Sequence, residues 1–289
     1  MKKKYPVLFL LIFLILIFAC SNEPSDGKTV FNTGPDAENY RSPGGKIDKL
    51  VNSPLPPSFR SSPDGKHALF LGRKTLTSID IMAGPKLGLG GVLFNPKNRG
   101  PAKPYSYSSI EILDLDSGTV RKVDGLPDKA NMGNFSWSPL SERVAFTLYK
   151  KKRIELWTLD IKTGTASKFT DKPISDSYYG SPYHWLSEGK GLIFKAVPDT
   201  KKDYIPYDPE NPTGPVVRSS SGKESQLRTY TNLLKSEKDK SVFEYYMSSD
   251  IFVKTDREAK RISKDRIHMT FDPSPDGELI LLEITKRPF

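Results

Sequence analysis

Cysteine and histidine are scarce in this chain of 289 residues. A single cysteine, Cys20, excludes any disulfide within the chain and any metal site built from several thiolates. The three histidines, His67, His184 and His268, lie far apart in the sequence, each beside an apolar run. We interpret them as structural or surface residues. The sequence therefore predicts no metal site and no cofactor.

Motifs of catalysis are missing as well. The chain contains neither the G-x-S-x-G of a nucleophile elbow nor H-E-x-x-H. Ser187-Glu188-Gly189-Lys190 matches S-x-x-K, but it lies in a repeated turn. Gly88-Leu89-Gly90-Gly91 lacks the Gly-Lys-Ser/Thr of a phosphate loop, and Asp114-Leu115-Asp116-Ser117-Gly118 lacks the later ligands of a calcium loop. We therefore predict no catalytic residue in this chain.

No apolar run reaches the roughly 20 residues that a membrane-spanning helix needs. The longest run, residues 7–19, follows three lysines and ends at the small residue Ala19, directly before Cys20. This order is typical of a secretory signal. Ile17-Phe18-Ala19-Cys20 resembles a bacterial lipobox with isoleucine where leucine is commonest. We expect cleavage between Ala19 and Cys20 and lipidation of the Cys20 thiol; the alternative is an ordinary signal or short anchor with an incidental cysteine.

Lipidation at Cys20 would make the membrane a partner and place the protein at the bacterial cell envelope. Ser21 after the cysteine favours the outer membrane, or the periplasmic face. We divide the chain into a lipoprotein signal peptide (1–19), a flexible tether rich in Ser, Asn, Gly and Pro (20–46) and a folded domain (47–289). The net charge of +10 comes from cations interspersed with acids, which favours a solvated surface over nucleic-acid binding.

One unit recurs through the folded part: a turn followed by an apolar strand. Ser62-Pro63-Asp64-Gly65-Lys66 precedes Ala68-Leu69-Phe70-Leu71, and further copies begin at Trp137, Trp185 and Ser274. The two tryptophans lie 48 residues apart, close to the roughly 40–50 residues of a four-stranded propeller blade. The longer intervals contain the stretches 84–104 and 198–223, rich in Gly or Pro, which we predict to be loop insertions.

Two further segments, 110–119 and 154–165, each combine a strand, a turn through Asp and Gly, and a return strand, which predicts hairpins. Together the patterns predict an all-β chain: an incomplete β-propeller of about four to five blades. We expect Trp137 and Trp185 in the blade cores. We also expect one short helix, capped by Thr231 and running through Lys235, with Phe243, Tyr245 and Tyr246 at its far end.

A series of short segments, taken in order, suggests a family. They are Pro56-Pro57, Arg73-Lys74, Lys86-Leu87, Phe135-Ser136-Trp137-Ser138, Pro212-Thr213-Gly214-Pro215, Arg228-Thr229-Tyr230, Phe243-Glu244-Tyr245-Tyr246 and Lys286-Arg287-Pro288-Phe289. From about residue 46 onward this order resembles the N-terminal propeller of the glutamyl endopeptidase subfamily of prolyl-oligopeptidase-like serine peptidases. Members of that family continue into an α/β-hydrolase domain that carries Ser, Asp and His, for which this sequence has no counterpart.

The resemblance implies a substrate-gating propeller of a secreted, lipid-anchored serine peptidase, with peptide substrates as partners when it is joined to a catalytic domain. The chain alone is expected to be inactive. The alternative is a non-enzymatic envelope lipoprotein whose propeller-like repeats bind a protein or peptide partner.

Overall fold

The computed structural model describes residues 45–73, 76–77, 79–199, 232–255 and 258–289. The chain divides into a unit of residues 1–50 and a unit of residues 51–289. Of the first unit the structure describes residues 45–50, which belong to the short helix α2 (Gly45–Val51). Among the described residues, no helix is long and apolar enough to cross a membrane. The predicted signal peptide, Cys20, nearly all of the predicted tether and most of the segment 198–223 lie outside the described residues.

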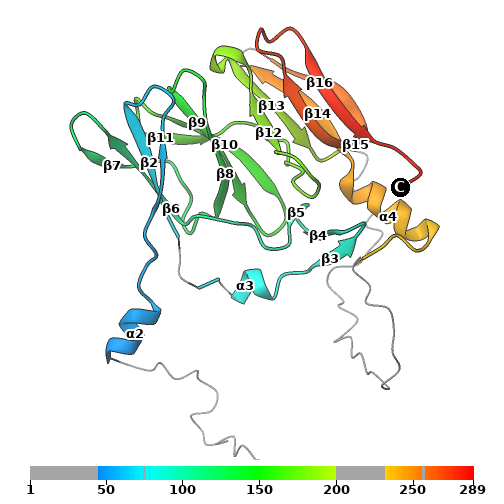
Figure 1. The fold of residues 1–289 in the computed structure, drawn as a ribbon, viewed down its shortest axis with the longest axis horizontal. Coiled ribbons are helices and arrows are strands. Elements are labelled where there is room, and N and C mark those ends of the chain that lie inside the picture. Colours follow the sequence, from blue (N-terminus) through cyan, green and yellow to red (C-terminus); the bar gives the residue numbers. More distant parts are fainter. Residues whose placement is uncertain (1–44, 74–75, 78, 200–231, 256–257) are drawn as a thin grey trace, which may run out of the picture. The chain divides into compact units, whose positions relative to one another are not determined.

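Blades 1 and 2 are four-stranded antiparallel sheets (Figure 1). Blade 1 consists, in order, of β1 (Ser58–Ser61), β2 (His67–Gly72), β6 (Ser109–Asp114) and β7 (Val120–Lys122). Blade 2 consists of β8 (Met132–Trp137), β9 (Arg143–Tyr149), β10 (Ile154–Asp160) and β11 (Thr165–Lys168).

Blades 3 and 4 share one long strand, β15 (Ala259–Pro273). Blade 3 begins with β12 (Tyr183–Trp185), the 3-10 turn η1 (Ser187–Gly189), β13 (Gly191–Ala196) and β14 (Ser249–Thr255). The first half of β15 pairs with β14 and completes this blade. Its second half pairs with β16 (Ile280–Thr285) and begins blade 4. The described residues thus hold three four-stranded blades and two strands of a fourth. The predicted fold class, an all-β incomplete propeller, is confirmed, with a blade number at the low end of the expectation.

The sequence repeat corresponds to one turn between the first and second strands of each blade. In three copies a serine hydroxyl accepts a hydrogen bond of 2.9–3.0 Å from the backbone N–H five residues later. Ser62 accepts from His67, Ser138 from Arg143 and Ser274 from Leu279. Gly65 and Gly277 have φ of +71° and +76°, a conformation that glycine adopts without strain. The predicted hairpins are also present, since Asp114 and Asp160 each accept bonds within the turn that follows.

Each pair of neighbouring blades buries a shared apolar core. Leu69 and Ile112 of blade 1 pack with Val144 and Phe146 of blade 2. A second core joins blades 2 and 3, and a smaller one joins blades 3 and 4; their fully buried members include Leu156, Ile174, Leu192, Phe194, Ile193 and Ile251. The inner strands β9 and β13 are buried on both faces, which explains their nearly continuous apolar sequences.

The tryptophans of the repeat lie between blades. The indole N–H of Trp137 donates to the carbonyl oxygen of Arg60 in blade 1 at 3.4 Å. The equivalent Trp185 donates to the carbonyl oxygen of Ser136 in blade 2 at 3.1 Å. Each tryptophan therefore links the first strand of its own blade to the first strand of the blade before it.

The insertions contain more regular structure than the sequence predicted. In blade 1 the helix α3 (Ile79–Met82) precedes a three-stranded sheet of β3 (Leu87–Leu89), β4 (Val92–Asn95) and β5 (Gly100–Pro101). Part of the stretch predicted to be loop is therefore strand. Gly90 and Gly91 form the tight β3–β4 turn, both with positive φ. In blade 3 the helix α4 (Glu237–Met247) begins after the predicted Lys235 and is capped by Ser236; Thr231 lies outside the described residues.

Candidate functional site: the joined insertions

Both insertions emerge at the same end of the blades. Each connects the second and third strands of its blade, β2 to β6 in blade 1 and β13 to β14 in blade 3. Because the strands are antiparallel, this end also carries the connections between successive blades, and the repeated serine turns lie at the opposite end. Figure 1 shows β3–β5 and α4 next to one another along this end. The insertions of blades 1 and 3 therefore meet there.

The two insertions share a core, which we call the insertion core. It is formed by Leu89 and Phe94 from the blade 1 insertion and by Phe243, Tyr246 and further buried residues of α4. The Phe94 and Tyr246 rings are 5.1 Å apart. Gly90, with φ +56°, approaches Phe243 so closely that a Cβ there would lie 2.7 Å from the ring. A glycine is therefore required at this turn by its φ and by the contact with α4.

Arg99 is the central polar residue of the insertion core. Its side chain is 6% exposed, and its Nη1 donates to the carbonyl oxygens of Tyr245 at 2.8 Å and Tyr246 at 3.4 Å, in the last turn of α4. The guanidinium also lies 4.6 Å and 5.3 Å from the centres of these two rings. A cation is favoured at the carboxyl end of a helix and over aromatic faces. Burial lowers the pKa of the Arg99 guanidinium, a change that the two tyrosines oppose.

The connection between blades 2 and 3 joins this core. The N–H of Asp176 donates to the carbonyl oxygen of Arg99 at 2.8 Å. The Ser177 hydroxyl donates to the carbonyl oxygen of Tyr246 at 2.7 Å, and the Tyr178 ring packs edge-on against Phe243 at 5.7 Å. The insertions of blades 1 and 3 are thus held to the connection between them, and α4 is bound from two directions.

A polar cluster lies beside this junction around the half-buried carboxylate of Asp176. Oδ2 of Asp176 accepts hydrogen bonds from the Tyr149 hydroxyl at 3.0 Å and from the Asn134 amide at 3.1 Å. Asn134 has φ +52° and lies in the bulge that shifts the register of β8 between Gly133 and Ser136. Bulges of this kind re-aim a side chain.

Buried charge gives this cluster unusual pKa values. Burial raises the pKa of the Asp176 carboxyl to about 6, and its hydrogen bonds and the positive charge of Lys195 act in the opposite direction. Burial lowers the pKa of the Lys195 ammonium to about 8. Lys195 donates to the carbonyl oxygens of Tyr179 at 2.6 Å and Met269 at 3.0 Å. A half-buried carboxyl with a raised pKa marks a candidate functional position.

The histidines do not combine into a reactive group. His67 lies in β2, His184 in β12 and His268 in β15. His268 is fully buried between the hydroxyls of Ser249 and Ser263, at 3.0 Å and 2.8 Å. This serine–histidine contact is closed to a substrate because Ser249 is also buried. Within the described ranges, no three His, Cys, Asp or Glu residues gather in a way that could hold a metal ion.

The predicted site residues Ala19 and Cys20 lie outside the described residues. The sequence-based prediction missed Arg99, Asp176 and the insertion core, although Phe243, Tyr245 and Tyr246 were recognised as an apolar group. The sequence did contain a signal for this core. Both strand-poor intervals between copies of the repeat carry aromatic residues of their own. Aromatic residues in an insertion are buried only when the insertion packs against a neighbouring segment.

Comparison with known proteins relates this propeller to peptidases. No family model matches the chain. The chain is 27% identical, over 268 residues, to a probable chloroplastic glutamyl endopeptidase of Oryza sativa subsp. japonica, covering 86% of this chain and 28% of that protein. The corresponding protein of Arabidopsis thaliana is 26% identical over 283 residues, covering 94% and 29%. The chain spans less than a third of the length of these curated relatives. It is a peptidase-related β-propeller.

Solved structures with similarity to the chain include a prolyl endopeptidase studied for the role of inter-domain dynamics, at 14% identity and a TM-score of 0.39, covering 81% of this chain and 26% of that one. TolB from Acinetobacter baumannii is 16% identical with a TM-score of 0.35, covering 80% and 37%.

Proposed function

We propose that this propeller controls substrate access in a serine peptidase and itself contributes no catalytic residue. The observation that carries the proposal is the similarity to two glutamyl endopeptidases over 86% and 94% of this chain. The chemistry of the described residues agrees with it, since the serine–histidine pair is buried and the histidines lie apart. The reaction of such a peptidase is hydrolysis of a peptide bond through an acyl-enzyme on an activated serine.

The proposed access route lies at the end of the blades that carries the joined insertions. A propeller limits access by the width and the rigidity of its opening. The insertion core ties blade 1 to blade 3, and Arg99 fixes α4 to this frame. Asp176, Asn134 and Tyr149 then supply polar groups at the same end. Elaborated connections on a rigid scaffold are where binding residues most often lie.

The experiment uses a fluorophosphonate probe, which reacts covalently with the activated serine of serine hydrolases. Source cells are treated with the probe, and the native polypeptide is captured with an antibody raised against residues 51–289. A labelled species in the precipitate, covalently continuous with this propeller or bound to it, supports the proposal. Antibody blocked with purified chain is the control. A precipitate that contains the propeller without any labelled hydrolase contradicts it and favours a non-enzymatic binding protein. The purified chain alone should remain unlabelled.

We also propose that the protein is anchored at the bacterial cell envelope through a lipidated Cys20. The support is the order of a basic segment, an apolar segment and Ala19-Cys20 at the N-terminus. Two or more acyl chains give firm membrane attachment, at about 0.8 kcal/mol for each buried methylene.

A further inference from the structure

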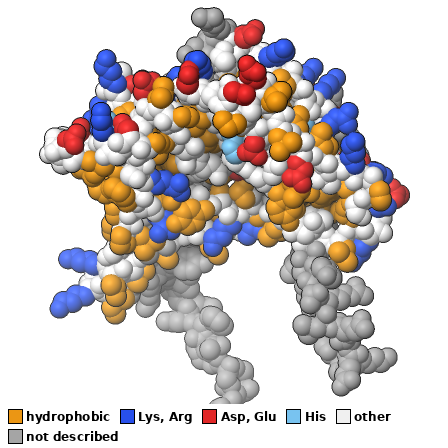
Figure 2. Space-filling model, turned by 45° about the horizontal axis from the view of Figure 1, so that its top comes forward, with side chains coloured by type: hydrophobic (Ala, Val, Ile, Leu, Met, Phe, Trp, Pro, Cys, Tyr) orange, Lys and Arg blue, Asp and Glu red, His pale blue; other side chains and the backbone are white. Residues whose placement is uncertain are grey.

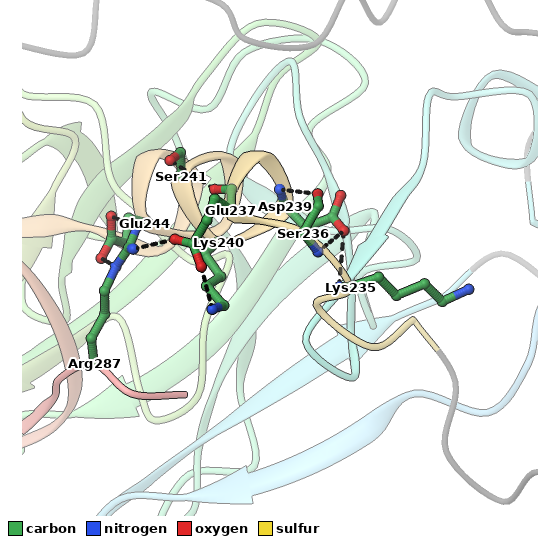
Figure 3. Close-up of polar contacts among 8 residues, drawn as sticks. All are labelled: Lys235, Ser236, Glu237, Asp239, Lys240, Ser241, Glu244 and Arg287. Carbon is green, nitrogen blue, oxygen red and sulfur yellow. Dashed lines mark hydrogen bonds and ion pairs between the residues drawn. The ribbon is translucent and has the colours of Figure 1, made fainter.

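Helix α4 has a second set of contacts, with the segment that follows β16. Arg287 follows β16 of blade 4 and binds Glu244 through two parallel bonds, from Nε at 2.6 Å and from Nη2 at 2.9 Å. Its Nη1 donates to Glu237 at 2.9 Å. Figure 3 shows Arg287 reaching the helix from the segment that follows β16, with both glutamates turned toward it. Glu237 and Glu244 are two turns apart on one face of the helix, so one guanidinium spans both.

Residues 286–289, which we call the strap, lie along this side of α4. Besides the ion pairs, the strap places the Phe289 ring edge-on against Phe243, with centres 5.2 Å apart. The strap also borders a recess of about 250 Å³ whose other walls come from α4, β15 and β16. The Arg287 ion pairs and the Phe289 ring therefore attach the strap to the helix.

The two sides of α4 differ in exposure. On the inner side Val242, Phe243, Tyr245, Tyr246 and Met247 are buried. On the outer side the side chains of Arg287, Glu237 and Glu244 are 41%, 72% and 37% exposed. Exposed ion pairs are screened by salt, because the Debye length falls from about 30 Å at 10 mM to about 3 Å at 1 M. Buried apolar contacts are not screened in this way.

We propose that α4 is held on two sides and that salt releases one of them. The ion pairs of Arg287 with Glu237 and Glu244 on the outer side, which we call the latch, are the contacts that salt releases. Arg287 leaves Glu237 and Glu244 when their charges are screened, and the strap then separates from α4 while the inner side stays bound to the insertion core. The latch couples blade 4 to the insertions of blades 1 and 3, and its release widens the recess beside β15 and uncovers the edge of Phe243. This coupling stands independently of the proposed peptidase function.

The latch can be tested by hydrogen exchange of the full chain at about 10 mM and about 1 M sodium chloride. Exchange of residues 286–289, corrected with a synthetic peptide of the same sequence, should be about five- to tenfold faster at high salt. Exchange of residues 242–247 should change little. Equal exchange of the strap at both salt concentrations would overturn the proposal, and so would loosening of residues 242–247 in parallel with the strap.

Variants separate the latch from a general effect of charge. Arg287→Ala should exchange rapidly at both salt concentrations. Arg287→Lys, which keeps the charge and loses the two-pronged contact, should be intermediate. Glu244→Gln removes one partner on the helix and should act like Arg287→Ala in weaker form. Lys238→Ala, which removes an exposed cation from α4 outside the latch, should behave like the unaltered chain. The proposal is wrong if the strap of Arg287→Ala exchanges at the same rate as that of the unaltered chain.

Discussion

Arg99 donates a hydrogen bond of 2.8 Å to the carbonyl oxygen of Tyr245, across 146 residues of sequence. The bond joins the insertion of blade 1 to the helix in the insertion of blade 3. The same residue accepts a bond from Asp176 in the connection between blades 2 and 3. One side chain and its backbone thus bring together three segments at the end of the blades where we propose substrate access.

We expect Arg99→Met to destabilise the domain by about 2–3 kcal/mol, because the carbonyl oxygens of Tyr245 and Tyr246 each lose the bond from Arg99 and the cation leaves the tyrosine rings. Arg99→Lys should recover only part of this, since an ammonium lacks the planar fork. Urea unfolding of the full chain measures the effect. Lys103→Met, at an exposed cation of the same insertion, is the matched control and should change stability by less than about 0.5 kcal/mol. Equal effects at both positions would exclude a special role for Arg99.

The repeated turns and hairpins were predictable because their bonds are local. A serine that accepts from the residue five positions later, or an aspartate that accepts from the residue three positions later, is visible in a short window of sequence. The insertion core was not predictable in this way. Arg99 is one of 44 Lys and Arg residues, and its partners lie far away in the chain. Because glycine is typical of loops, Gly88, Gly90 and Gly91 led to a loop prediction where the structure has the strands β3 and β4.

The N-terminus gives a prediction that does not depend on the propeller. Expressed in a bacterium with a lipoprotein pathway, the protein should partition into detergent, and mass spectrometry should find acyl chains on Cys20 as the first residue. Cys20→Ser should abolish the modification and release the protein into the aqueous phase. An unmodified mature N-terminus at another residue would contradict the lipobox interpretation.

His268 should make the domain sensitive to acid. Burial lowers its pKa to about 4, helped by the charges of Lys195 and Arg266 and opposed by Asp250 and a bond to Ser249. The unfolded chain, with a histidine pKa near 6.5, therefore binds the proton first as the pH falls. Stability should decrease between pH 6.5 and pH 4 by at most about 3 kcal/mol from this residue.

His268→Gln can still bond Ser249 and Ser263 but does not titrate. The difference in unfolding free energy between this variant and the unaltered chain should shift in favour of the variant as the pH is lowered from 6.5 to 4. A difference that stays constant across that interval would show that His268 is protonated at the same pH in both states.

Asp176 should have the opposite dependence on pH. Its pKa is raised to about 6 in the folded chain, from 3.8. Above pH 6 Asp176 is ionised in both states, and its ionisation costs more free energy in the folded state, which lowers stability. Below pH 3.8 the carboxyl is protonated in both states and this cost vanishes. Asp176→Asn keeps an oxygen that accepts from Tyr149 and Asn134, and it removes the charge. We expect the variant to be more stable by about 1 kcal/mol at pH 7.5, after allowance for the partial exposure of the site.

The gain from Asp176→Asn should shrink as the pH falls through 6 and disappear below about pH 3.8, as measured by urea unfolding at several pH values. Asp171→Asn, in the same connection between blades, is the matched control. Its carboxylate is exposed and bonded to Lys168, which lowers its pKa, so neutralising it should bring no gain at pH 7.5. If Asp176→Asn instead destabilises the domain at pH 7.5, the ionised carboxylate stabilises the polar cluster, and the prediction that burial makes its charge costly is wrong.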